Sequence, residues 1–159
     1  MEQEYVFFWG TESPFSNWHP AKFKIDGKEF CNTEQWMMYS KAILMLDYEM
    51  AEKVMCTPDP RTVKALGRKV KNFNSNLWDK VKFDVVFNGC LAKFSQNEEI
   101  KMALLGTGDK KICEASPVDY IWGIALDAAH AAKTPEDKWP GQNLLGKVLM
   151  KVREELKKS

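Results

Sequence analysis

The chain has 159 residues, a length typical of one domain that buries roughly 70% of the surface its unfolded form exposes. Hydrophobic residues make up 45% and charged residues 28% of the sequence, a globular composition that excludes intrinsic disorder. A net charge of +1 excludes a uniformly basic, sequence-independent nucleic-acid binder, so any contact with nucleic acid should be local.

The apolar stretches of the sequence are short. The longest, Ala42–Leu46, is far below the roughly 20 residues that a membrane-spanning helix needs. Residues 1–10 lack the basic start and the cleavage site of a signal peptide. We therefore expect a cytoplasmic protein, or a nuclear one in a eukaryote, with no membrane partner.

The four cysteines are widely spaced and form no C-x-x-C pair. Only His19 and His130 are available to help them hold a metal ion, so we expect buried thiols, and neither a metal nor another cofactor. The cysteines are Cys31, Cys56, Cys90 and Cys113.

Strands are predicted in the first thirty residues. Tyr5–Trp9 is a continuous apolar run, and Lys22–Phe30 alternates around Asp26-Gly27, a strong hairpin signal. The loop between them, TESPFSNWHP, carries Phe15, Trp18 and His19 among turn-forming residues. These side chains either face a ligand or fold back onto the core.

Helical patterns dominate after Asn32, which with Gln35 resembles a capping box. Residues 128–142 look irregular, and we find no repeat or linker. The sequence therefore predicts one helix-rich α+β domain over residues 1–159, with a small N-terminal β-hairpin. The expected helices cover residues 32–46, 47–56, 59–70, 76–95 and 97–106 and a last helix from Asn143, with a short strand at 111–114.

Two carboxylate-bearing segments are candidates for catalysis. Glu34 and Lys41 lie seven residues apart on the first helix and so share one face, although such pairs also occur on solvated helices. The segment Glu114–Gly123, EASPVDYIWG, places carboxylates beside an aromatic residue, as sugar sites do, although a capped turn with a core Trp explains it equally.

A phosphate contact is predicted at Arg68 in the segment LGRKV, although a basic helix face is often simply solvated. The segment GTGD from Gly106 lacks the spacing of a phosphate-binding loop. We find no Ser-His-Asp or Cys-His grouping either.

Seven segments in a fixed order resemble the NADAR family, also called YbiA-like, over nearly the whole chain. Besides the hairpin they are WGTESPFSNW, TEQWMMYSKA, LGRKV, LAKFSQN, LLGTGDKKICEASPVDYIWGI and NLLGKVLMKVR. The resemblance implies a helix-rich α+β fold and an N-glycosidase that hydrolyses the bond between a phosphorylated ribose and an exocyclic base amine.

Residue by residue, the resemblance implies that Glu34, Lys41 and Asp119 are catalytic. Ala125 departs from the family, because a second glycine is expected after Trp122-Gly123-Ile124. The residues expected to bind the substrate are Trp9, Gly10, Ser13, Phe15, Asn17, Trp18, Arg68, Ser116, Trp122 and Gly123.

Two substrate classes follow from the resemblance. One is ADP-ribose on the guanine amino group of DNA or RNA, and the other is the early phosphoribosylamino-pyrimidine intermediates of riboflavin synthesis. We expect the first, since these 159 residues include no riboflavin-pathway domain. A module that binds ADP-ribose without cleaving it is a further alternative, but it would have no use for the pair Glu34 and Lys41.

Two mechanisms are open. Lys41 could displace the base amine by transimination, with Glu34 moving protons. Alternatively, a carboxylate-activated water attacks C1 of the ribose, and Lys41 acts only through its charge.

Overall fold

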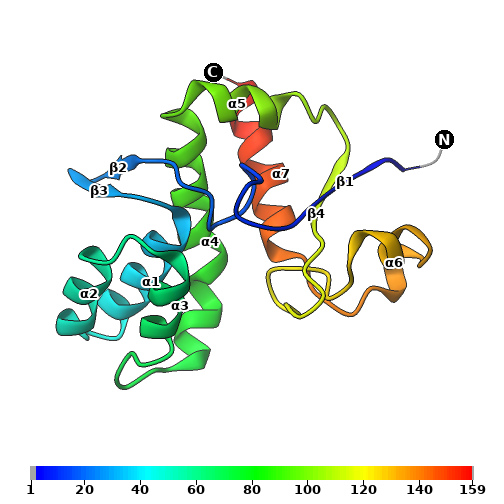
Figure 1. The fold of residues 1–159 in the computed structure, drawn as a ribbon. Coiled ribbons are helices and arrows are strands. Elements are labelled where there is room, and N and C mark those ends of the chain that lie inside the picture. The colour runs from blue at the N-terminus through cyan, green and yellow to red at the C-terminus, as the bar shows by residue number, and fades with distance from the viewer. Residues whose placement is uncertain (1–2, 159) are drawn as a thin grey trace. The chain divides into compact units, whose positions relative to one another are not determined.

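The structure, a computed structural model, describes residues 3–158, so residues 1, 2 and 159 of the expected domain lie outside it. The chain divides into two compact units. One joins the N-terminal segment through Ser16 to the residues from Glu98 onward, and the other comprises residues 17–97. The predicted α+β class is confirmed (Figure 1). That the whole chain acts as one domain stays a prediction.

The unit of residues 17–97 begins with the predicted hairpin, β2 (Phe23–Ile25) and β3 (Lys28–Phe30), which pair antiparallel. Asp26 and Gly27 both have positive φ, 51° and 80°, as a two-residue hairpin turn requires. The rings of Phe23 and Phe30 stack across the strands with centroids 5.7 Å apart, and both side chains are buried.

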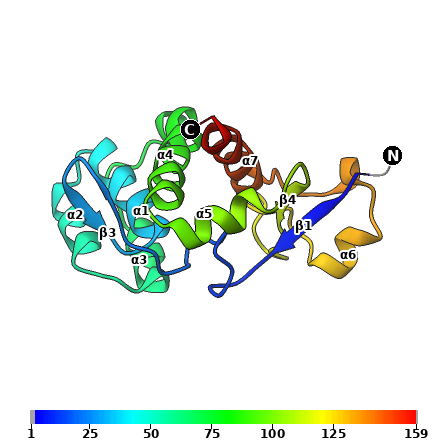
Figure 2. The same ribbon diagram turned by 90° about the horizontal axis from the view of Figure 1, so that it is seen from above.

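Four helices follow, and each starts after a side chain that accepts a hydrogen bond from a backbone N–H of the first turn. This local capping explains why the predicted starts lie within one or two residues of the observed ones. Both views show α1 among the other three helices (Figures 1 and 2). The helices are α1 (Thr33–Leu44), α2 (Tyr48–Met55), α3 (Pro60–Gly67) and α4 (Ser75–Ser95), capped by Asn32, Asp47, Asp59 and Asn74.

The buried side chain of Gln35 connects the start of α1 to the end of α2. Its Oε1 accepts a hydrogen bond of 2.8 Å from the Cys31 N–H. Its Nε2 lies 3.0 Å, 3.3 Å and 3.1 Å from the carbonyl oxygens of Val54, Met55 and Thr57. Since the last carbonyls of a helix have no partner within it, Gln35 supplies a donor to the Met55 carbonyl and a further donor to the Val54 carbonyl, which also accepts from the Thr57 N–H.

Two glycines let helices approach α1 closely. A Cβ on Gly67 in α3 would lie 1.9 Å from Met38 Sδ, and a Cβ on Gly89 in α4 would lie 2.3 Å from a ring carbon of Trp36. The Trp36 indole also donates to the Val85 carbonyl at 2.7 Å. The contact faces of α1 are therefore fixed by shape and by one partly buried hydrogen bond.

In the other unit, β1 (Tyr5–Phe8) pairs parallel with β4 (Lys111–Glu114), seen side by side in Figure 2. The expected strand at Tyr5 thus pairs with a segment more than 100 residues away in sequence, not with the hairpin. Such pairing has no local signal. The other elements of the unit are α5 (Glu98–Leu105), α6 (Ala128–Ala132), a 3-10 turn (Glu136–Lys138) and α7 (Leu144–Lys157).

The expectation that residues 128–142 are irregular is wrong for α6 and the 3-10 turn. Asp127 caps α6 by accepting from the His130 N–H, a start signal that the sequence carries. The last helix follows Asn143 as predicted, but that side chain does not cap it. Asn143, at φ 55°, accepts from the Glu114 N–H at 3.1 Å and donates to the Ile112 carbonyl at 3.0 Å, which ties α7 to β4.

The prediction of buried thiols is confirmed for Cys90 and Cys113 but wrong for Cys56, which is exposed, and for the half-buried Cys31. Cys56 follows the last turn of α2, where the chain leaves the core. Within residues 3–158, no group of three or more His, Cys, Asp or Glu could hold a metal ion. No helix in the same range is long and apolar enough to cross a membrane.

Replacing Gln35 by Met should lower the free energy of unfolding by about 3 kcal/mol, because the partly buried Cys31 N–H and the carbonyls of Met55 and Thr57 lose the partner that Gln35 supplies. Chemical denaturation measures the change. Gln96→Met is the matched control, since Gln96 is exposed and binds the backbone of Lys24 through its N–H and its carbonyl. Equal losses of under about 1 kcal/mol in both variants would contradict the role assigned to Gln35.

Candidate functional site

The residues predicted to form the site are distributed over both units. Asn17, Trp18, Glu34, Lys41 and Arg68 belong to the unit of residues 17–97. The other unit contains Trp9, Gly10, Ser13, Phe15, Ser116, Asp119, Trp122 and Gly123.

Glu34 is a buried carboxylate in the first turn of α1, with 5% of the residue exposed. Its backbone N–H donates to the Asn17 carbonyl at 3.0 Å, and its Oε1 accepts from the Trp18 indole N–H at 3.1 Å. The structure therefore brings Asn17, Trp18 and Glu34 together. A carboxylate in this position is oriented by an indole and lies where the helix dipole favours negative charge.

Lys41 lies two turns further along α1 and is half-buried. Its Nζ donates to the Gly67 carbonyl at 2.8 Å and lies 4.5 Å from the centroid of the Phe73 ring. Burial is the main cause that lowers the pKa of Lys41, and the charge of Arg68 lowers it further, while Glu34 opposes the shift. The amine is thus shifted toward its neutral, nucleophilic form.

Two further residues belong to this cluster and were missed in the sequence. The guanidinium carbon of Arg61 lies 5.9 Å from the centre of the Trp18 ring. Phe73 is 45% exposed in the segment between α3 and α4. A sequence signal could have identified Arg61, because it is a cation in the first turn of α3, where the helix dipole disfavours positive charge. An aromatic residue within the polar run NFNSN is the corresponding signal for Phe73.

Asp119 forms a tight turn. Its Oδ1 accepts from the backbone N–H groups of Ile121 and Trp122 at 3.0 and 2.8 Å. Close chain packing explains Gly123, where a Cβ would lie 3.0 Å from the Glu114 carbonyl and 3.2 Å from the Cβ of the buried Ser116. The turn accounts for these residue types structurally, so a catalytic role for Asp119 stays a prediction.

The first loop, residues 9–18, contains one exposed and one buried aromatic side chain. Trp9 is 62% exposed, whereas Phe15 is buried and packs edge-on against Phe8 with ring centroids 5.7 Å apart. Gly10 has φ 101°, and Ser13 Oγ accepts from the Phe15 N–H at 3.3 Å. Phe15 therefore belongs to the core. Trp18 and His19 are both half-buried.

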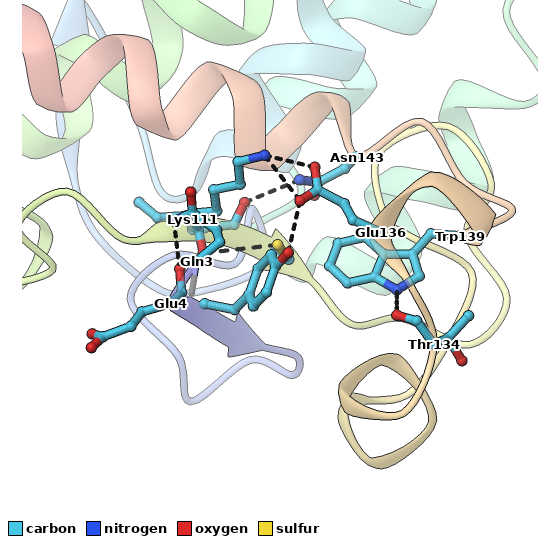
Figure 3. Close-up of polar contacts among 10 residues, drawn as sticks. Gln3, Glu4, Lys111, Thr134, Glu136, Trp139 and Asn143 are labelled. Atoms are coloured by element: carbon cyan, nitrogen blue, oxygen red, sulfur yellow. Dashed lines mark hydrogen bonds and ion pairs between the residues drawn. The ribbon is translucent and has the colours of Figure 1, made fainter. Parts of the chain in front are cut away.

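A cavity of about 250 Å³ lies in the unit that contains β1 and β4, and Figure 3 shows Lys111, Glu136, Trp139 and Asn143 from its lining. Lys111 Nζ binds both carboxylate oxygens of Glu136 at 2.9 Å, and the Tyr5 hydroxyl donates to one of them at 2.8 Å. The pKa of Glu136 is lowered mainly by Lys111. Burial raises the pKa of the Cys113 thiol to about 12, so it is a poor nucleophile. Because Lys111, Glu136 and Tyr5 bind one another, this cluster is better explained as a structural contact than as a reactive centre.

The fold and this arrangement define a helix-rich α+β protein with a buried carboxylate and a desolvated amine on one helix. Residues 7–157 match the NADAR domain. N-glycosidase R617 of Acanthamoeba polyphaga mimivirus is 50% identical, covering 96% of each chain. N-glycosidase YbiA of Escherichia coli is 30% identical over 98% of this chain and 91% of that protein.

Protein irg-1 of Caenorhabditis elegans is 39% identical, covering 96% of this chain and 79% of that protein. The NMR structure of the E. coli protein YbiA superimposes with a TM-score of 0.80 at 28% identity, over 99% of this chain and 87% of that one. The chain belongs to the NADAR domain family.

The departure at Ala125 has a structural consequence, because Ala125 has φ 62° and is buried. The left-handed region costs a residue with a Cβ roughly 1–2 kcal/mol. Glycine would relieve this strain, but part of the gain would be lost because glycine gives up more conformational entropy on folding than alanine does. Ala125→Gly should therefore raise the free energy of unfolding by about 0.5–1 kcal/mol. Thermal unfolding measures this as a Tm increase of about 1–4 °C.

Ala115→Gly is the control, since Ala115 is equally buried but does not have a positive φ, and this change should be destabilising. If Ala125→Gly destabilises the protein as much as Ala115→Gly does, the backbone at Ala125 is not strained.

Proposed function

We propose that the chain hydrolyses an N-glycosidic bond and that Glu34 and Lys41 perform the chemistry. The observation that carries the proposal is the pairing of a buried carboxylate with an amine whose pKa burial lowers, both on α1. A protein that only binds a nucleotide needs neither group. The names of the relatives R617 and YbiA as N-glycosidases support the reaction class.

The substrate we propose is ADP-ribose attached to the exocyclic amino group of guanine in DNA or RNA. Arg61 and Arg68 supply exposed guanidinium groups for phosphate, and Trp18 and Phe73 supply aromatic faces for the base. The phosphoribosylamino-pyrimidine intermediates of riboflavin synthesis offer the same C1–amine bond and one phosphate. Incubation with each substrate separates the two, and turnover of the pyrimidines alone would contradict our choice.

In the first mechanism, the Glu34 carboxylate takes the proton of the exocyclic N–H and passes it to the ring oxygen as the ribose ring opens, leaving an imine between C1 and the base nitrogen. The neutral Nζ of Lys41 then adds to C1, and the base amine leaves with a proton. Water hydrolyses the resulting Lys41–C1 imine, which restores the amine and releases the sugar. The sum is one water consumed, one sugar hydroxyl formed and one base amine freed.

In the second mechanism, Glu34 takes a proton from a water molecule that attacks C1 as the protonated base amine departs. Lys41 remains charged throughout and acts only on the developing negative charge or on substrate phosphate. The lowered pKa of Lys41 favours the first mechanism, since a residue used only as a cation gains nothing from burial.

Lys41→Arg separates these mechanisms, because arginine keeps the charge but cannot form the imine. We expect kcat to fall by a factor on the order of a thousand, as when other catalytic groups are removed. Borohydride should trap a sugar adduct on Lys41 of the unmodified protein, detected by peptide mass spectrometry. Lys80→Arg, at an exposed position of α4, controls for the substitution itself. Near-normal turnover without an adduct would favour attack by water.

The pH profile provides an independent test of the imine route. Because only the neutral amine attacks, kcat/KM should rise with pH and level off above the pKa of Lys41 in the folded protein. Burial and Arg68 lower this pKa, so the midpoint should lie below the ordinary lysine value of about 10.4. Arg68→Gln removes the like charge and should move the midpoint to higher pH. A profile without a rising limb would contradict the neutral-amine role.

A further inference from the structure

The exposed face of α3 and the turn after it contain an unusual concentration of positive charge. Residues 61–71 include five of the 23 Lys and Arg residues of the chain and none of its 22 Asp and Glu, so the rest of the chain has 18 cations against 22 carboxylates. Four of these residues, Arg61, Lys64, Arg68 and Lys69, are exposed, and we call them the α3 cationic face. The near-neutral net charge hides this local excess.

Within residues 3–158, no ion pair involves a cation of this face, whereas three lysines on other helices are paired. Lys53 on α2, Lys82 on α4 and Lys157 on α7 each pair with a carboxylate one turn earlier on the same helix. On α3, Lys64 instead lies three residues after Arg61 and four before Arg68. Like charges at these spacings destabilise a helix by a few tenths of a kcal/mol per pair.

The helix dipole does not explain the whole face. It favours cations at the C-terminal end, where Arg68 and Lys69 follow α3, but it disfavours Arg61 in the first turn. The Asp59 carboxylate accepts hydrogen bonds from the Thr62 N–H and hydroxyl, and the charge of Arg61 also lowers the pKa of Asp59, but the two side chains form no ion pair. We leave Lys71 out of the face because it lies beyond the turn that follows α3 and its backbone N–H donates to the Asp47 carboxylate at 2.9 Å.

Aromatic groups accompany these cations. Arg61 lies over the Trp18 ring at one end of α3, and Lys41, which binds the Gly67 carbonyl at the other end, lies over the exposed Phe73 ring. Cations alternating with aromatic faces are characteristic of surfaces that hold single-stranded nucleic acid, where phosphates meet the cations and bases stack on the rings. A flat anionic membrane surface would not require the rings in this arrangement.

We propose that the α3 cationic face docks the phosphodiester backbone of a single-stranded nucleic acid whose modified base enters the site of Glu34 and Lys41. The inference rests on the proposed function for its choice of polymer. Arg61 and Arg68 are separated by about 10 Å of helix rise, roughly the axial length of three stacked nucleotides. A base amine must leave the stack to react, and a single strand makes that easiest.

The test uses Lys64→Gln/Lys69→Gln, two positions outside the proposed catalytic and sugar-binding groups. The control, Lys80→Gln/Lys133→Gln, changes the net charge equally at exposed positions on α4 and after α6. Fluorescence anisotropy with an unmodified 12-nucleotide single strand gives the affinity at several salt concentrations. We expect the slope of log affinity against log salt to decrease in magnitude by about 1.4 for the α3 variant, with the control unchanged.

Kinetics separate the failure of this proposal from the failure of the proposed function. The α3 variant should lose about tenfold or more in kcat/KM on a single strand that contains ADP-ribosyl-guanine, but should cleave ADP-ribosyl-guanosine as the unmodified protein does. No turnover of either substrate by the unmodified protein contradicts the proposed function, while the anisotropy result still decides the docking surface.

Three results would overturn the docking proposal. They are no binding of the single strand by the unmodified protein, equal losses in the two variant pairs, and binding to phosphatidylserine vesicles that the α3 variant abolishes while binding of the strand is unaffected. Equal losses would mean that net charge alone governs the interaction. The vesicle result would assign the face to an anionic membrane surface.

Discussion

The close approach of α1 to α3 at Gly67 is the contact on which the proposed site depends. A Cβ at this position would lie 1.9 Å from Met38 Sδ, so a side chain here would require Met38 or the helix to move. Lys41 lies one turn after Met38, and its amine donates to the Gly67 carbonyl at 2.8 Å. The same contact withdraws the amine from water, which is the main cause of its lowered pKa. Packing and reactivity therefore have a common origin.

The polar residues around the start of α1 maintain this geometry. Asn32 accepts from the Gln35 N–H, Gln35 binds the end of α2, and the Asn32 Nδ2 donates to the Pro58 carbonyl at 2.9 Å. Pro58 immediately precedes Asp59, the residue that caps α3. One buried network thus fixes where α2 ends and where α3 begins. A fully satisfied network of this kind favours one arrangement of the helices over others.

How much the sequence predicts depends on how local each interaction is. The caps Asn32, Asp47 and Asp59 act within one turn, so the helix starts were predicted to within a residue or two. The pairing of β1 with β4, and the contrast between buried Phe15 and exposed Trp9, depend on segments distant in sequence. The contacts of Trp18 with Glu34 and Arg61 depend on such segments too, and neither contact was predicted.

Ala125 illustrates a different limit of sequence analysis. The resemblance identified it as a departure from glycine, and its φ of 62° shows that the backbone here has a conformation suited to glycine. The turn is held by its surroundings, including the hydrogen bond from the Gly141 N–H to the Ile124 carbonyl at 2.9 Å. Propensity at one position was therefore overridden by contacts that no local pattern reveals.

An amine that must lose its proton beside a phosphorylated substrate faces an electrostatic conflict. Phosphate raises the pKa of a neighbouring lysine, and a phosphate bound to Arg68 would neutralise the charge that lowers the pKa of Lys41. Burial is not cancelled in this way, because it arises from the packing of α1 against α3 and persists when the substrate binds. A site that depended on like-charge repulsion would lose its neutral amine on binding. Burial as the larger cause is the arrangement compatible with an anionic substrate.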